Sequence, residues 1–157
     1  MQKIGPCLWF DHQAEEAADF YVSVFPISRI LSKTRYVEGL PQQVGSVMTV
    51  AFVLDGEGFI ALNGGPMFQF TPAVSFAIRC ETQAEVDHYW RRLTEGGAEG
   101  QCGWLTDRYG VSWQVVPTML IAMLERGEAA ASKRAVAAML QMKKLDIAAL
   151  QRAYDHP

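Results

Sequence analysis

The feature of this sequence that most limits its fold is an order of strands and helices that occurs twice. The first half predicts one strand, one amphipathic helix and three further strands, at residues 4–10, 13–25, 28–37, 46–54 and 59–63. The second half predicts the same order, with a strand at 73–80, a helix from Thr82 to Gly96, and two or three short strands near 98–102, 103–106 and 111–116. A chain built in this way folds into two similar modules.

A shift of 69 residues places the first strand and helix on the second. It pairs Pro6 with Ser75, Glu16 with Glu85, Ala17 with Val86, and Val24 with Leu93. Thr82 and Glu85 also have the spacing of a capping box at the start of the second helix. We therefore predict an internal duplication of a βαβββ module, over residues 1–68 and 69–117, and an α+β fold class.

The chain changes character after Pro117 and becomes helical to its end. Apolar residues recur at helical spacing near 119–125, 129–142 and 144–154. This tail, residues 118–157, is too short to be expected to form a core of its own. We expect it to pack on the second module or on a partner chain, and its apolar stripe, together with unpaired sheet edges, favours a homodimer.

Charge, hydropathy and cysteine content exclude several classes of protein. The 14 Lys and Arg against 17 Asp and Glu leave a net charge of −3, which gives no broad attraction for nucleic acid or anionic lipid. No apolar run approaches the roughly 18–20 residues that span a bilayer, and the N-terminus lacks the pattern of a signal peptide. Cys7, Cys80 and Cys102 form an odd set without metal-site spacing, so we expect a cytoplasmic protein.

Several short segments together resemble one known family. They are Cys7-Leu8-Trp9-Phe10, Ala14-Glu15-Glu16-Ala17, Phe25-Pro26, Leu62-Asn63-Gly64-Gly65-Pro66, Cys102-Gly103-Trp104-Leu105, Asp107-Arg108-Tyr109-Gly110 and Ser112-Trp113-Gln114. This pattern is similar to the PhnB-like branch of the vicinal oxygen chelate superfamily, which includes the glyoxalases. Its members often carry the label 3-demethylubiquinone-9 3-methyltransferase domain. The resemblance implies that residues 1–117 form one glyoxalase-like domain, an incomplete barrel with a cup for small molecules, and that residues 118–157 extend it.

The resemblance also implies where a divalent metal would bind, on the first and last strands of each module. The hairpin spacing from Asp107 and Gly110 points to Gln114, and the shift gives Ala61, Pro6 and Ser75 as the other positions. These four residues offer no carboxylate and no imidazole, which divalent ions prefer. A divalent metal therefore lacks its usual ligands, and we predict no cofactor. The chain has no Gly-rich nucleotide loop either, so the methyltransferase label is not expected to describe its activity.

Three local features could carry chemistry, and each has a simpler structural interpretation. Asp11 and His12 could form a general base, although neighbours on a strand point apart and a solvated turn explains them too. Cys102 could be a nucleophile if Arg108 lowered its pKa. Asn63 with Gly64-Gly65 could bring backbone amides close to an anion, or could form a plain turn that needs a positive φ.

The predicted function is the binding of a small organic molecule, with Asn63, Ser75, Trp104 and Gln114 as ligand-binding residues. The sheets also carry five aromatic residues, of which about half should face a ligand and half the helices; they are Trp9, Phe59, Phe76, Trp104 and Trp113. The alternative is a glyoxalase-like enzyme of isomerase, lyase or dioxygenase type acting on a small metabolite. A third alternative is a purely structural homodimer.

Overall fold

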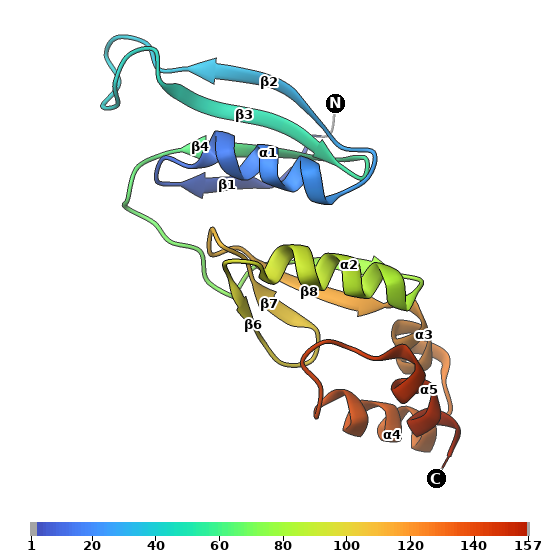
Figure 1. Ribbon diagram of the computed structural model, residues 1–157. Coiled ribbons are helices and arrows are strands. Elements are labelled where there is room, and N and C mark those ends of the chain that lie inside the picture. The colour runs from blue at the N-terminus through green and yellow to red at the C-terminus, as the bar shows by residue number, and fades with distance from the viewer. Residues whose placement is uncertain (1–2, 157) are drawn as a thin grey trace. The chain divides into compact units, whose positions relative to one another are not determined.

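Each half of the chain forms its own sheet with its own covering helix, as the repeated order predicts (Figure 1). The computed structural model describes residues 3–156. It divides into two compact units, which meet between Phe70 and Thr71 in the sequence. We call them unit 1 and unit 2 and describe each by itself.

Unit 1 has one helix on a four-stranded mixed sheet. Its elements are β1 (Cys7–Phe10), α1 (Ala14–Val24), β2 (Arg29–Arg35), β3 (Val47–Leu54) and β4 (Glu57–Asn63). The strand order is β1-β4-β3-β2, with β1 parallel to β4 and the other pairs antiparallel. The apolar face of α1 is buried, and Tyr21 stacks on Phe52 of β3 with ring centroids 6.3 Å apart. The helix therefore covers one face of the sheet with the core between them.

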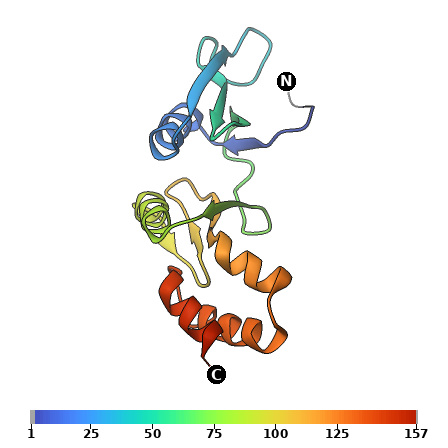
Figure 2. The same cartoon turned by 90° about the vertical axis from the view of Figure 1, so that its right-hand side faces the viewer.

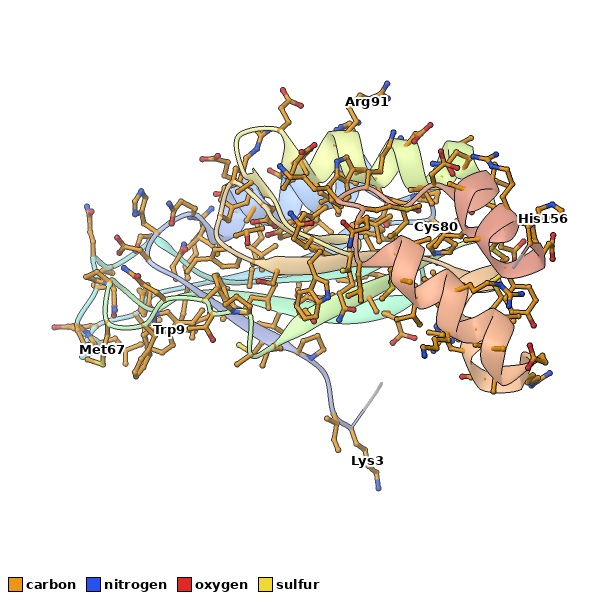
Figure 3. All side chains as sticks on the ribbon, turned by 90° about the horizontal axis from the view of Figure 1, so that it is seen from below. Lys3, Trp9, Met67, Cys80, Arg91 and His156 are labelled. Carbon is orange, nitrogen blue, oxygen red and sulfur yellow. The ribbon has the colours of Figure 1, made fainter. Side chains whose placement is uncertain are left out.

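Unit 2 repeats this arrangement, and its last three strands are shorter than their counterparts in unit 1. Its elements are β5 (Ser75–Cys80), α2 (Gln83–Thr94), β6 (Ala98–Glu99), β7 (Trp104–Thr106) and β8 (Ser112–Pro117), in the order β5-β8-β7-β6. The predicted capping box is confirmed, because the Glu85 backbone N–H donates to the Thr82 hydroxyl and the Thr82 N–H donates to the Glu85 carboxylate. Val86, Trp90 and Leu93 are the buried face of α2. Arg91 projects from the outer side of this helix (Figure 3).

The helical tail packs within unit 2 and forms a small core, which corrects the expectation that it is too short for one. Its helices are α3 (Thr118–Arg126), α4 (Ala129–Met139) and α5 (Ile147–Asp155), and Figure 2 shows them following the sheet of unit 2. The buried core residues are Leu120, Met123, Ala135, Leu145 and Leu150. The side chain of Gln83 on α2 joins this helix to the start of α5 through two hydrogen bonds. It donates to the Leu145 carbonyl at 3.1 Å and accepts from the Ile147 N–H at 2.9 Å.

The α+β class is confirmed, with two open mixed sheets rather than a closed barrel. None of the helices described over residues 3–156 is long and apolar enough to cross a membrane.

The strand register corrects the alignment of the two modules by one residue. Leu8 pairs with Ala61 and Ile78 pairs with Val115, and all four side chains are buried. The first strands therefore correspond with a shift of 70, whereas the buried helix positions correspond with the predicted 69. The counterpart of Gln114 in unit 1 is consequently Ile60. It is not the predicted Ala61, because Ala61 is buried under α1. In the same way, the counterpart of Ser75 is Gly5 and not the predicted Pro6.

Candidate functional site

Three of the four predicted ligand-binding residues lie together on one face of the sheet in unit 2. Val115 is fully buried on the α2 side, so strand alternation turns Gln114 to the opposite face, which we call the distal face. There the Gln114 amide nitrogen donates to the Ser75 hydroxyl at 2.9 Å. Trp104 is the cross-strand partner of Gln114 on β7. An amide, a hydroxyl and an indole thus share this face, and all three side chains are half-buried.

Asn63, the fourth predicted residue, lies in unit 1 and fastens its elements together. Its side-chain oxygen accepts from the Ala14 N–H at 2.8 Å, and its amide nitrogen donates to the Val47 carbonyl at 3.0 Å. The hydroxyl of Tyr36 donates to the Asn63 carbonyl. Asn63, at the end of β4, therefore caps the N-terminus of α1. The N-cap residue itself, Gln13, makes no side-chain hydrogen bond there.

The glycines after Asn63 continue from the end of β4 and commit their backbone N–H groups to carbonyls of Phe10 and Asp11. The N–H of Gly64 donates to the Phe10 carbonyl at 2.9 Å, and that of Gly65 donates to the Asp11 carbonyl at 3.1 Å. Gly65 has φ +92°, and a Cβ at Gly64 would lie 2.2 Å from the Trp9 ring. Gly65 thus has the positive φ that the structural interpretation requires, and the commitment of both amides to protein carbonyls leaves the anion hypothesis without support.

A cavity of about 420 Å³ lies beside Asn63 in unit 1. Its lining comes from the β1–α1 link, the first turn of α1, the 36–46 loop and the end of β4, and consists of Asp11, His12, Glu15, Tyr36, Gln42, Gln43, Ser46, Val47, Asn63 and Gly65. Its volume is within the range of small-molecule sites. Sequence reasoning missed this cavity, because nothing in the 36–46 loop pattern indicates where the loop folds.

The ionisable side chains at this cavity form two pairs. His12 Nδ1 lies 3.4 Å from a carboxylate oxygen of Asp11, although the His12 side chain is 76% exposed. The strand-alternation argument against this pair fails, since both residues follow β1 in a bend. Glu15 pairs with Lys33, and the hydrogen bond from Lys33 lowers the pKa of the Glu15 carboxyl. Whether Asp11 and His12 act as a base stays a prediction.

Of the three cysteines, Cys80 is buried, Cys7 is exposed and Cys102 is half-buried. Burial, and then the charge of Glu85, raise the pKa of the Cys80 thiol to about 12, and burial raises the pKa of Cys7. Cys102 lies in the β6–β7 turn with φ +57°. Arg108, the cation expected to activate Cys102, donates to the Glu95 carbonyl at 3.1 Å and lies 3.7 Å from its carboxylate. The structure thus ties Arg108 to Glu95 and gives Cys102 no support as a nucleophile.

The aromatic residues divide between the two faces of the sheets, as predicted. Phe59 stacks on the buried Phe52, and Phe76 contacts the buried Trp113, so these rings lie on the helix side. Trp104 lies on the distal face of unit 2. Trp9, labelled in Figure 3, donates its indole N–H to the Gly65 carbonyl at 2.9 Å and packs edge-on against Phe68.

The donor set does not fit a divalent metal. In the corrected register the last-strand positions are Gln114 and Ile60, an amide and a hydrocarbon. Over residues 3–156, no three or more His, Cys, Asp or Glu side chains come close enough to hold an ion. The metal positions that the resemblance implies are therefore occupied by residues of the wrong chemistry.

Two βαβββ units with open mixed sheets define a protein of the glyoxalase-like class, related to the vicinal oxygen chelate superfamily. The chain belongs to the family described as 3-demethylubiquinone-9 3-methyltransferase, whose model matches residues 2–116. No curated protein matches the chain.

Solved structures agree with this assignment. A putative 3-demethylubiquinone-9 3-methyltransferase, PhnB protein, from Bacillus cereus is 39% identical, with a TM-score of 0.68 over 74% of this chain and 99% of that one. Protein PA1353 from Pseudomonas aeruginosa is 20% identical, with a TM-score of 0.61 over 74% and 98%. The fosfomycin resistance protein FosX from Listeria monocytogenes, in complex with Mn(II) and sulfate, is 14% identical, with a TM-score of 0.50 over 72% and 88%. The last two show similarity of fold alone.

Proposed function

We propose that this chain binds a small organic molecule on the distal face of unit 2, without a resident divalent metal. The observation that supports the proposal most is the hydrogen bond between the Gln114 and Ser75 side chains, next to the indole of Trp104 on the neighbouring strand. A half-buried amide and hydroxyl on a sheet face are suited to orient a ligand, because each keeps further hydrogen-bonding capacity after pairing with the other. Trp104 supplies apolar surface next to them.

The chemistry of these groups indicates the kind of ligand. The Gln114 side chain keeps a carbonyl oxygen and a second N–H, and the Ser75 hydroxyl keeps its own proton. An indole contributes most to the free energy of binding when it contacts a flat or apolar group of the ligand. The ligand is therefore a small molecule with one flat or apolar part and one amide-like or carboxyl-like part.

The family description does not by itself support methyl transfer here. Among the residues that the structure describes, no Gly-rich loop joins a strand to a helix in the way that holds a nucleotide-like methyl donor. The metal positions also carry the wrong donors. Binding that depends on side-chain hydrogen bonds and burial is the function that these residues can perform unaided.

A titration of the full chain with aromatic amides and aromatic carboxylic acids, followed by ¹H–¹⁵N NMR with and without a chelator, tests the proposal. We expect saturable shifts on β5, β7 and β8 that the chelator leaves unchanged. Gln114→Ala should weaken the apparent Kd about tenfold, as the loss of a hydrogen bond predicts. The matched control Gln151→Ala, on the exposed side of α5, should change it less than twofold. Equal effects of both variants, or shifts that need added metal, contradict the proposal.

One observation favours a second candidate, a glyoxalase-like enzyme. Asp11 lies 3.4 Å from His12 at the edge of a cavity, and a carboxylate beside an imidazole is a common general-base arrangement. Substrate-dependent proton exchange that is lost in His12→Gln but kept in Gln114→Ala would support this candidate. Exchange that persists in His12→Gln would remove it.

A further inference from the structure

Three hydroxyl side chains form one row across the distal face of unit 2. Ser112, on the central strand β8, pairs with Ser75 of β5 on one side and with Thr106 of β7 on the other. Val115 is buried on the helix side of β8, so alternation turns Ser112 and its two partners to the distal face. The hydroxyl row lies about 7 Å along β8 from the row that contains Gln114, since the two rows are two residues apart.

The hydroxyl of Ser112 is buried without a protein partner. Ser112 is only 2% exposed, and within residues 3–156 its side chain makes no hydrogen bond. In the same part of the chain, no side-chain nitrogen or oxygen is both sealed from solvent and unpaired. The Ser112 oxygen is therefore still reached from the distal face. A buried hydroxyl without a protein partner is uncommon and indicates a bound water or ligand.

The neighbours of Ser112 supply further donors to the same place. The Ser75 hydroxyl accepts the Gln114 amide N–H at 2.9 Å, which leaves the Ser75 O–H available to donate. The Thr106 hydroxyl also makes no hydrogen bond among the described residues. Neighbouring strands lie about 4.8 Å apart, so an oxygen atom placed between two of these hydroxyls is within reach of both. The row is therefore suited to a group that accepts several hydrogen bonds.

The charge on this face favours an acceptor that is itself negative. On β5, β7 and β8, alternation places no Asp or Glu on the distal face, and Arg79 is the one charged residue that it places there. Arg79 makes no hydrogen bond or ion pair within residues 3–156. A positive charge without a compensating acid raises the local concentration of anions.

We propose that Ser75, Ser112 and Thr106 bind a carboxylate of the ligand, whose flat part lies against the Trp104 indole. This inference rests on the proposed function and narrows it, because it adds Ser112 and Thr106 to the site and selects an anionic ligand over a neutral amide. Trp104 lies in the Gln114 row, about 7 Å from the hydroxyl row. That spacing corresponds to a ring and a carboxylate joined by a short carbon chain.

A bound water that satisfies Ser112 is the competing explanation, and ligand binding would then not depend on this hydroxyl. Ser112→Ala separates the two, because it removes a hydroxyl that has no protein partner and should therefore leave stability unchanged. Ser132→Ala is the matched control. The Ser132 hydroxyl donates to the Met123 carbonyl at 2.6 Å in the tail of the same unit, so its loss should lower stability and leave binding unchanged.

The experiment is a ¹H–¹⁵N NMR titration of the full chain with 3-phenylpropionate, and with 3-phenylpropionamide as a neutral probe of similar shape, at constant ionic strength. We expect saturable shifts of residues 75–79, 104–106 and 112–116, and binding of the carboxylate at least about fivefold tighter than that of the amide. Ser112→Ala should weaken the apparent Kd for the carboxylate about tenfold without a change in the urea midpoint. Ser132→Ala should lower the midpoint and change the Kd less than about twofold.

The outcomes that overturn this inference differ from those that overturn the proposed function. Saturable binding of the amide that equals or exceeds that of the carboxylate would agree with the proposed function and refute the carboxylate site. A Kd in folded Ser112→Ala within about twofold of the wild type would show that Ser112 holds only water. If Ser112→Ala does not fold, Thr106→Val is judged by the same criterion. A lack of shifts from both probes would contradict the proposed function and this inference with it.

Discussion

Replacement of Asn63 by alanine should destabilise unit 1 substantially, because Asn63 joins three of its parts. The change removes the oxygen that caps the Ala14 N–H at 2.8 Å and the donor to the Val47 carbonyl at 3.0 Å. Loss of a helix cap costs about 1 kcal/mol, and loss of one further hydrogen bond costs about 1 kcal/mol. We expect the free energy of opening α1 to fall by about 2 kcal/mol.

Hydrogen exchange measured by mass spectrometry on peptides covering residues 14–24 reports this opening within unit 1. A loss of about 2 kcal/mol makes exchange of the α1 amides roughly 30-fold faster, since 1.4 kcal/mol is a factor of ten. Asn63→Asp keeps the cap acceptor but sets a carboxylate oxygen against the Val47 carbonyl, so it should destabilise the β3 contact while preserving the cap of α1.

Gln13→Ala is the matched control, because Gln13 occupies the N-cap position of α1 yet makes no side-chain capping bond. We expect it to change the stability of α1 by less than about 0.5 kcal/mol. If Gln13→Ala destabilises α1 as much as Asn63→Ala does, the capping role assigned to Asn63 is wrong. Unchanged α1 exchange in Asn63→Ala refutes that role as well.

Four further predictions follow from other parts of the chain. Asp107→Ala should lower the free energy of unfolding, measured by urea denaturation, by about 3 kcal/mol. The Asp107 side chain is 3% exposed and accepts hydrogen bonds from two backbone N–H groups and from the Trp113 indole N–H. A loss below about 1 kcal/mol would be inconsistent with those bonds. Hydrogen bonds, first from Lys144, lower the pKa of the Asp87 carboxyl in the folded protein. The ionised carboxylate therefore stabilises the fold at a pH above the pKa of Asp87 in the unfolded chain, and this stabilisation is lost as the pH falls through the pKa of the folded state. The melting temperature of Asp87→Asn should consequently vary less with acid pH than that of the wild type. Elemental analysis after chelator-free purification should find less than stoichiometric zinc, nickel or iron, and one equivalent of any of them would contradict the donor-set argument. The apolar stripe of the tail is packed within unit 2, so only the unpaired edges of the two open sheets still favour a homodimer. On that ground we propose a homodimer, and light scattering that gives 17.5 kDa at all micromolar concentrations would rule it out.

Periodicity and capping signals were sufficient to predict the elements of both modules. Thr82 and Glu85 satisfy each other locally, so their spacing alone identified the start of α2. The alternation of residues 112–117 likewise placed Gln114 and Val115 on opposite faces. These features depend on residues a few positions apart, which the sequence displays directly.

The features that the sequence did not predict depend on residues far apart along the chain. Asn63 caps α1 across 49 positions, and nothing local to Asn63 indicates that partner. The one-residue error in the strand alignment arose because the helices dominated the comparison. The link from Phe10 to the N-cap Gln13 is one residue longer than that from Cys80 to Thr82, and a slip of one residue moves every strand side chain to the other face.

The two modules have diverged most in the connection between their second and third strands. In unit 1 this connection is the long 36–46 loop, whose side chains form a wall of the cavity. In unit 2 it is the short 100–103 turn, where Cys102 and Gly103 donate their backbone N–H groups to the Met142 and Lys143 carbonyls of the tail, each at 2.8 Å.

A Cβ on Gly103 would lie 2.7 Å from the Val115 carbonyl oxygen and 3.1 Å from Leu145, so the tail can pack this closely only because the turn is short and carries a glycine there. The connection between the second and third strands therefore lines a polar cavity in unit 1, and in unit 2 it anchors the helical tail. This difference places the cavity beside the long loop of unit 1 and the anchored tail beside the short turn of unit 2, although both halves follow one pattern.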